Sequence, residues 1–215
     1  PGSFISVGVK EAIPSKFFVY NIDKENAIVQ EADSLTPNLL KHTDDTLLWV
    51  DTQGFSDKES IHTLFETLNI PSLLQEDIIN TRHRPKIEAF DDSLLIVTKR
   101  IIAGHGKRLH TEHIVLLLGP DYILSFQPPV NDSFHGVRDR ILKIKYPYTH
   151  KGYIFYMLLD NLIDSHFAIM EHLHQRLDRL ENKLLTGKEE SSPQEELAGL
   201  KHDISMARRI IVPMR

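Results

Sequence analysis

Residues 86–101 read KIEAF-DDS-LLIVTKRI, and residues 112–127 read EHIVLLL-GPD-YILSFQ. Each stretch places three turn-forming residues between two apolar runs that are rich in β-branched and aromatic side chains. This pattern is a specific signal for a β-hairpin. We therefore expect two consecutive hairpins, with strands at 86–90, 94–101, 112–118 and 122–127.

Further strand and helix candidates surround the hairpins. Short apolar runs between turn residues predict strands at 17–20, 27–30 and 46–51. Ser56 and Glu59 have the spacing of a capping box and predict the start of a helix. Helical patterns also cover 72–80 and 133–145. Strands interleaved with helices favour an α/β fold in which a mixed β-sheet lies between helical layers.

The sequence changes in character near residue 148. From Lys151 to Leu185 it has no proline, and it has no glycine after Gly152. Residues with three- and four-residue spacing form a coiled-coil-like seam: Tyr156, Leu159, Ile163, His166, Met170, Leu173, Leu177, Leu180 and Leu184. After a break at 186–187, the same spacing recurs at Leu197, Leu200, Ile204, Ala207 and Ile211. We expect a long-helix antiparallel hairpin, or stalk.

These patterns divide the chain into segments. We interpret residues 1–3 as a cloning scar, 4–147 as an α/β domain and 148–215 as the stalk. The second arm still reads as helical at Arg215, which suggests that the chain is cut from a longer protein.

Composition excludes several classes of protein. The chain has 215 residues, no cysteine and a formal net charge of −5. A disulfide scaffold and a thiol nucleophile are therefore excluded, and nucleic acid is not an expected partner because no wide basic surface is evident. No apolar run approaches the roughly 20 residues of a membrane span, and no signal peptide is evident. The sequence has no phosphate loop, nucleophile elbow or dinucleotide fingerprint, so we do not expect an enzyme.

Two pairs of carboxylates are the candidates for chemistry. Glu76 and Asp77 are adjacent and flanked by apolar residues, and their oxygens suit Mg²⁺ or Co²⁺; the alternative is a solvated helical turn. Asp160 and Asp164 share one face of the long helix. Two like charges among apolar residues point to a bound cation, unless that face is exposed.

The 12 histidines provide a weaker signal. His110 and His113 fall on opposite faces of a predicted strand, which does not suit a zinc site. His166 lies on the seam, where a core histidine with a hydrogen-bond partner is expected. The basic run at residues 82–86 is expected to lead into the next strand and to pair with acidic neighbours.

Several motifs together resemble the cytoplasmic domain of CorA-type magnesium transporters. They are PSLLQEDIIN at 71–80, RPKIE at 84–88, DDSLLIV at 91–97, LDNLIDSHF at 159–167 and the stretch 200–213. The resemblance implies a homopentamer in the full-length protein, anchored in the cell inner membrane by helices missing here, with this domain on the cytoplasmic side. The truncated chain itself is expected to be a monomer or a weak oligomer.

The resemblance also implies a weak, regulatory Mg²⁺ or Co²⁺ site between subunits. Asp77 matches the principal interface carboxylate of the family, Glu76 its neighbour, and Asp160, with Asp164, a second site. A cation between subunits cancels carboxylate repulsion and couples ion binding to assembly. The family's partner aspartate is expected beyond Arg215.

Two other interpretations remain open at this point. The histidine count is compatible with a zinc transporter of the same superfamily, although hard carboxylate ligands favour Mg²⁺. A soluble oligomerisation adaptor with no metal role is also compatible with an α/β domain followed by a helical hairpin. A metal-dependent hydrolase using His110 and His113 has the least support.

Overall fold

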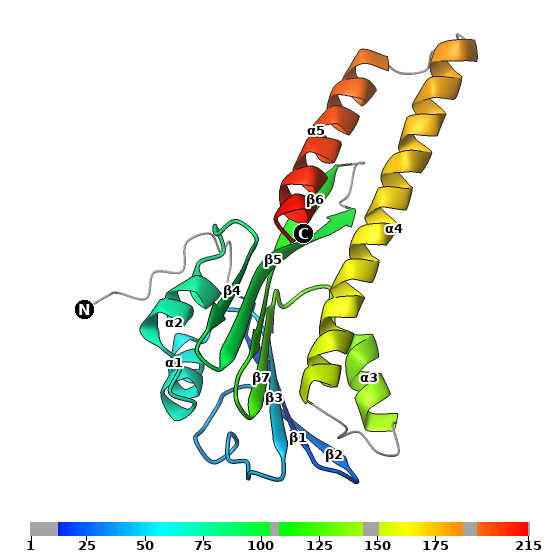
Figure 1. Ribbon diagram of the computed structural model, residues 1–215. Coiled ribbons are helices and arrows are strands. Elements are labelled where there is room, and N and C mark those ends of the chain that lie inside the picture. Colours follow the sequence, from blue (N-terminus) through cyan, green and yellow to red (C-terminus); the bar gives the residue numbers. More distant parts are fainter. Residues whose placement is uncertain (1–12, 104–107, 144–150, 187–192, 215) are drawn as a thin grey trace.

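A seven-stranded sheet forms the centre of the computed structural model, which describes residues 13–103, 108–143, 151–186 and 193–214 (Figure 1). The strand order is β2-β1-β3-β7-β6-β5-β4. β3 and β7 pair in parallel and every other described strand pair is antiparallel, so the sheet is mixed as expected. The strands are β1 Lys16–Ile22, β2 Ala27–Ala32, β3 Leu47–Gln53, β4 Lys86–Phe90, β5 Ser93–Ala103, β6 Leu109–Leu118 and β7 Tyr122–Gln127.

Both predicted hairpins are confirmed as β4–β5 and β6–β7. In the first turn Asp91 adopts a positive φ of 46°. In the second, the N–H of Gly119 donates to the carbonyl of Tyr122 at 2.8 Å. A Cβ at position 119 would lie 2.3 Å from the Tyr122 ring, so the close approach of ring and backbone requires glycine there.

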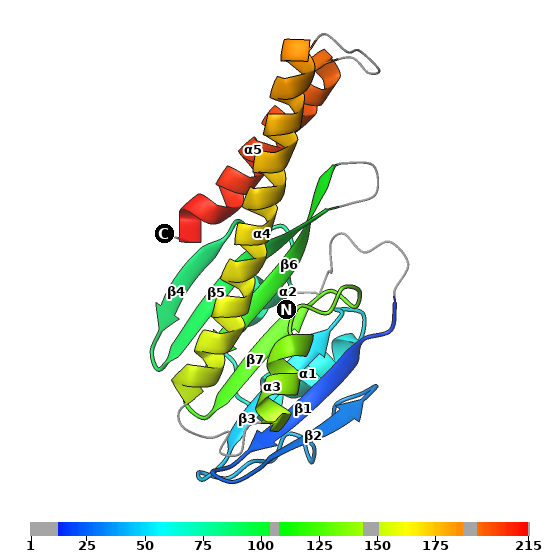
Figure 2. The ribbon, with the colours of Figure 1, turned by 90° about the vertical axis from the view of Figure 1, so that its right-hand side faces the viewer.

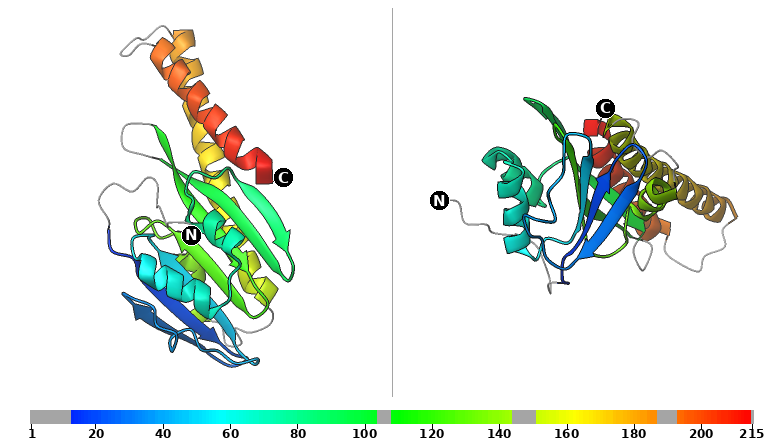
Figure 3. Two further views of the ribbon diagram at one scale, coloured as in Figure 1. Left: turned by 90° about the vertical axis from the view of Figure 1, so that its left-hand side faces the viewer. Right: turned by 90° about the horizontal axis from the view of Figure 1, so that it is seen from below.

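Helices cover both faces of the sheet (Figures 2 and 3). On one face lie α1 (Lys58–Thr67) and α2 (Ser72–Ile79), which share an apolar core with β1, β3, β5, β6 and β7. On the other lie α3 (His135–Lys143) and α4 (Lys151–Thr186), with a second core around Trp49. The predicted sheet between helical layers is thus confirmed.

The start of α1 differs from the capping-box prediction. Asp57, rather than Ser56, caps the helix, and its Oδ1 accepts a hydrogen bond from the N–H of Ser60 at 3.0 Å. Ser56 instead donates its hydroxyl to the carbonyl of Ile13 at 2.9 Å. Ser and Asp both favour the N-cap position. The capping-box prediction was wrong because a tertiary contact engages Ser56, which leaves the cap to Asp57.

The predicted long helix is confirmed as the 36-residue α4, about 54 Å long. α5 (Pro193–Ile211) packs antiparallel beside it and ends in a short 3₁₀ turn, η1 (Val212–Met214). Figure 1 shows this hairpin extending beyond the sheet. Within the described residues, no helix has both the length and the apolar character needed to cross a bilayer.

The predicted seam of α4 is only half correct. His166, Leu173 and Leu180 are buried, but the alternate seam residues face solvent: Tyr156, Ile163, Met170, Leu177 and Leu184. The buried side of the hairpin instead continues through Ile169 and the Arg176–Asp203 ion pair, whose Nη1 and Oδ2 atoms are 2.5 Å apart. α4 packs first on the sheet and then on α5, which shifts its buried face away from the regular seam.

Candidate metal site

Glu76 and Asp77 lie in the last turn of α2. Leu74 and Ile78 anchor this helix in the core, and His113 of β6 holds its end, with Nε2 3.2 Å from the carbonyl oxygen of Ile78. Burial lowers the pKa of His113 to about 4. The ring is therefore neutral at physiological pH and donates its Nε2 proton to that carbonyl.

Asp77 is almost completely buried, with 5% of its surface exposed. Nζ of Lys86 lies 2.8 Å from its Oδ2 atom, and Nε2 of His83 lies 3.3 Å from Oδ1. Burial acts to lower the pKa of Lys86, but the carboxylates of Asp77 and Glu88 outweigh it, so this pKa lies above its ordinary value. The charge of Asp77 is thus balanced within the chain, whereas the neighbouring Glu76 is exposed.

Asp160 and Asp164 lie one turn apart on α4, and both are exposed. They line a small pocket of about 190 Å³ together with Arg140 of α3. The hydroxyl of Tyr156 donates to Oδ1 of Asp160 at 3.3 Å, and the Asp160 carboxylate raises the pKa of Tyr156. The alternative of an exposed helix face is thus confirmed, because α4 turns both carboxylates toward solvent.

The sheet separates the two carboxylate pairs. α2 belongs to the core on one face, through Leu74 and Ile78, while α4 belongs to the core on the other, through Leu158 and Leu162. Among the residues that the structure describes, no three His, Asp or Glu side chains gather closely enough to hold a metal ion. A single copy of the chain does not bring these four residues together.

The histidines lie largely as the sequence indicated. His113 is buried and His110 is exposed, on opposite faces of β6. Nε2 of His166 lies 3.0 Å from the carbonyl oxygen of Lys99, so this residue is a core histidine with a backbone partner. The pair at 172 and 174 diverges, with His172 half-buried and His174 exposed.

The basic run at residues 82–86 follows the prediction in part. His83 and Lys86 pair with Asp77 as expected. Arg82 and Arg84, however, are exposed, and neither pairs with a carboxylate in the described part of the chain. They line a groove against α5, a segment more than 100 residues away, which no local pattern could indicate.

The structure thus combines an α/β domain with a long helical stalk and places one of the two carboxylate pairs on each. Residues 44–215 match the family model described as "CorA-like Mg2+ transporter protein". The chain therefore belongs to the CorA-like Mg²⁺ transporter family.

One curated relative is the cobalt/magnesium transport protein CorA of Thermotoga maritima, which is 31% identical over 175 residues. The match covers 79% of this chain and 49% of the relative, so the chain spans about half of that protein's length.

Solved structures show the same fold. The soluble domain of CorA from Methanocaldococcus jannaschii matches with a TM-score of 0.67 at 18% identity, over 91% of this chain and 75% of that one. The ZntB cytoplasmic domain from Vibrio parahaemolyticus matches with a TM-score of 0.59 at 13% identity, over 92% of this chain and 79% of that one. At these identities the likeness extends to the fold alone.

Proposed function

We propose that this chain is the cytoplasmic, divalent-cation-sensing part of a Mg²⁺/Co²⁺ transporter of the inner membrane. Its family membership and the name of the Thermotoga relative support the transport role. The observation that carries the sensing role is the buried carboxylate of Asp77, held by Lys86 and His83 beside the exposed Glu76. A buried carboxylate in the last turn of a helix is poised to exchange the Lys86 ammonium for a metal ion.

The chemistry of the four carboxylates suits a weakly held, hydrated Mg²⁺. This ion prefers oxygen ligands and usually keeps several of its waters, so one or two carboxylates suffice at each site. Glu76 and Asp77 supply one such pair, and Asp160 and Asp164 supply another. Because these pairs lie on opposite faces of the sheet, we infer that ligands from a neighbouring copy complete each site.

Exposed apolar residues on the stalk support assembly into a homo-oligomer, which we propose is the pentamer of the family. Phe167 is 68% exposed, and it lies on α4 near exposed residues of the predicted seam, among them Ile163 and Met170. An apolar stripe of this kind on a helix is typical of an interface between subunits. Cations that bind between copies would then favour the assembled, closed state by mass action.

Thermal melting in Mg²⁺, Co²⁺, Zn²⁺ or EDTA tests the sensing role. For a Kd on the order of 1 mM, about 10 mM Mg²⁺ stabilises the protein by about 1.4 kcal/mol, or a rise in Tm of roughly 3–6 °C. We expect Asp77→Asn to remove most of this rise and Asp160→Asn to reduce it.

Asp44→Asn removes an exposed loop carboxylate and is the matched control. An Asp77→Asn protein that keeps the full rise would contradict the proposal. A rise with Zn²⁺ alone would instead favour the zinc-transporter interpretation, and equal melting in all four conditions would favour the adaptor.

A further inference from the structure

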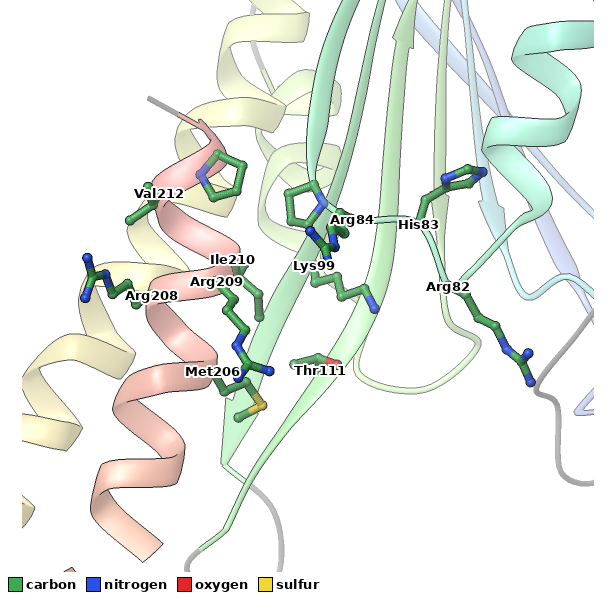
Figure 4. A pocket seen from close by; sticks show the side chains of 12 residues that line it. Arg82, His83, Arg84, Lys99, Thr111, Met206, Arg208, Arg209, Ile210 and Val212 are labelled. Atoms are coloured by element: carbon green, nitrogen blue, oxygen red, sulfur yellow. The ribbon is translucent and has the colours of Figure 1, made fainter. Parts of the chain in front are cut away.

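A groove of about 610 Å³ lies between α5 and the sheet, and none of the four carboxylates lines it (Figure 4). One wall is formed by the end of α5 and by η1. The other consists of the connection between α2 and β4, together with β5 and β6. We call this feature the basic groove and define it by its five Arg and Lys residues: Arg82, Arg84, Lys99, Arg208 and Arg209.

The charge of the basic groove is unbalanced. No carboxylate lines it, and none of its five Arg and Lys side chains forms an ion pair with a carboxylate of the described residues. Arg100, Arg138 and Arg176, in contrast, each pair with an aspartate or glutamate, whereas Arg140 and Arg179 bond a hydroxyl and a backbone carbonyl. In a chain with a net charge of −5, this concentration of unpaired positive charge creates a local field that attracts anions.

The side chains of the groove come from separate elements. In Figure 4, Arg209 and Met206 reach from α5 toward Thr111 of β6, while Lys99 and Arg84 lie on the opposite wall. Arginine forks, a lysine ammonium and a threonine hydroxyl are the donors that bind phosphate oxygens. These donors come from α5, β5, β6 and the connection between α2 and β4, so they lie on both walls of the groove.

The helix dipole of α5 explains the position of two of the arginines, but not the positions of the cations on other elements. Arg208 and Arg209 lie in the last turn of α5, where positive charge stabilises the negative end of the helix dipole. This effect accounts for cations on α5 only. Lys99 and Arg84 belong to other elements and gain nothing from that dipole, although they carry like charges to the same groove.

The groove also has an apolar part. Pro85, Met206, Ile210, Val212 and Pro213 line it beside the cations. An inorganic ion would leave these surfaces in water, whereas an organic group attached to a phosphate would cover them. The volume lies within the range of small-molecule sites, which is about 300–1,000 Å³.

We propose that the basic groove binds a phosphate-bearing organic anion of nucleotide size, with the phosphates on Arg84, Lys99 and Arg209 and the organic group on the apolar wall. The inference goes beyond the proposed cation sensing and does not depend on it. The groove adjoins the metal candidate, because His83 both lines the groove and pairs with Asp77.

Isothermal titration calorimetry of the whole chain with ATP, AMP and inorganic triphosphate tests this proposal. The titrations are made in EDTA, so that the metal carboxylates do not contribute. The test variant is Arg84→Gln/Arg209→Gln, in which both positions are exposed and the fold is expected to persist. The control is Lys24→Gln/Lys201→Gln, which removes two exposed cations outside the groove.

The proposal predicts that ATP binds more tightly than triphosphate and that affinity falls with added salt. The test variant should bind ATP at least tenfold more weakly, since each lost contact is a charge-assisted hydrogen bond. The control variant should bind as the unaltered chain does.

Three results would overturn the proposal. The first is that no probe binds, and the second is that ATP binding is weakened equally in the test and control variants. The third is that ATP does not bind, while the chain sediments with phosphatidylglycerol vesicles in a manner that depends on Arg84 and Arg209. The last result would assign the basic groove to a membrane surface instead.

Discussion

Nζ of Lys86 lies 2.8 Å from Oδ2 of the buried Asp77, across the connection between α2 and β4. Under the proposed function, a metal ion that binds Asp77 has to compete with this ammonium group for the carboxylate. In the absence of metal this ion pair stabilises an otherwise unbalanced buried charge. Lys86 is therefore both a structural partner of Asp77 and a competitor of the proposed cation.

Removing this competitor should strengthen metal binding. We expect Mg²⁺ to bind Lys86→Gln roughly fivefold more tightly. This factor corresponds to the loss of a competing contact worth about 1 kcal/mol. The titration of Tm against Mg²⁺ concentration measures this shift. Lys16→Gln, which breaks the exposed pair with Glu31, is the control and should leave the Mg²⁺ response unchanged. A response in Lys86→Gln that is equal to or weaker than that of the unaltered chain would be inconsistent with competition.

The separation of the carboxylate pairs predicts independent effects on folding. Without metal, the changes in unfolding free energy for Asp77→Asn and Asp160→Asn should add to within about 0.5 kcal/mol, because the two residues share no partner. Asp160→Asn alone should cost less than about 0.5 kcal/mol, since this side chain is exposed. Urea denaturation in EDTA measures both quantities, and a larger interaction energy would mean that the sheet does not separate the sites.

The buried His113 predicts a pH dependence of stability. Its pKa is lowered to about 4 in the folded state, whereas an unfolded histidine titrates near pH 6.5. The unfolded state therefore binds more protons between these values, and stability falls as the pH falls. From pH 7 to pH 5 the unaltered chain should lose about 2 kcal/mol more than His113→Leu does. Urea denaturation at both pH values gives this difference, and parallel losses would show that His113 is not buried as a neutral ring.

The Arg176–Asp203 pair joins the two arms of the stalk. Asp203→Ala should destabilise the chain by about 3–5 kcal/mol, because it leaves a buried guanidinium unpaired. The double replacement Arg176→Met/Asp203→Leu should be near neutral, since apolar residues of similar size often replace a buried pair without cost. Urea denaturation followed by circular dichroism compares the two. A double variant as unstable as Asp203→Ala would mean that the pair itself determines how the arms pack.

Short-range sequence patterns predicted the strands and helices well, but they predicted the contacts between them less well. The hairpins and the long helix could be identified because turn residues and apolar spacing act within a few positions. The buried face of α4 could not, because contacts with β5 and α5 exclude Met170 and Leu177 from the interface.

The candidate site shows the same limit. Sequence indicated the carboxylates and the pairing of the 82–86 run with acidic neighbours. It did not indicate which acid Lys86 pairs with, nor that the sheet separates Asp77 from Asp160. The basic groove combines segments more than 100 residues apart, so only the folded chain displays it.

The proposed function requires that a divalent cation joins copies of the chain through Asp77. Sedimentation velocity of the unaltered chain and of Asp77→Asn, each in Mg²⁺ and in EDTA, tests it most directly. We predict that Mg²⁺ increases the sedimentation coefficient of the unaltered chain and leaves that of Asp77→Asn unchanged. Equal sedimentation of the unaltered chain in Mg²⁺ and EDTA, or an equal increase in both proteins, would contradict the claim.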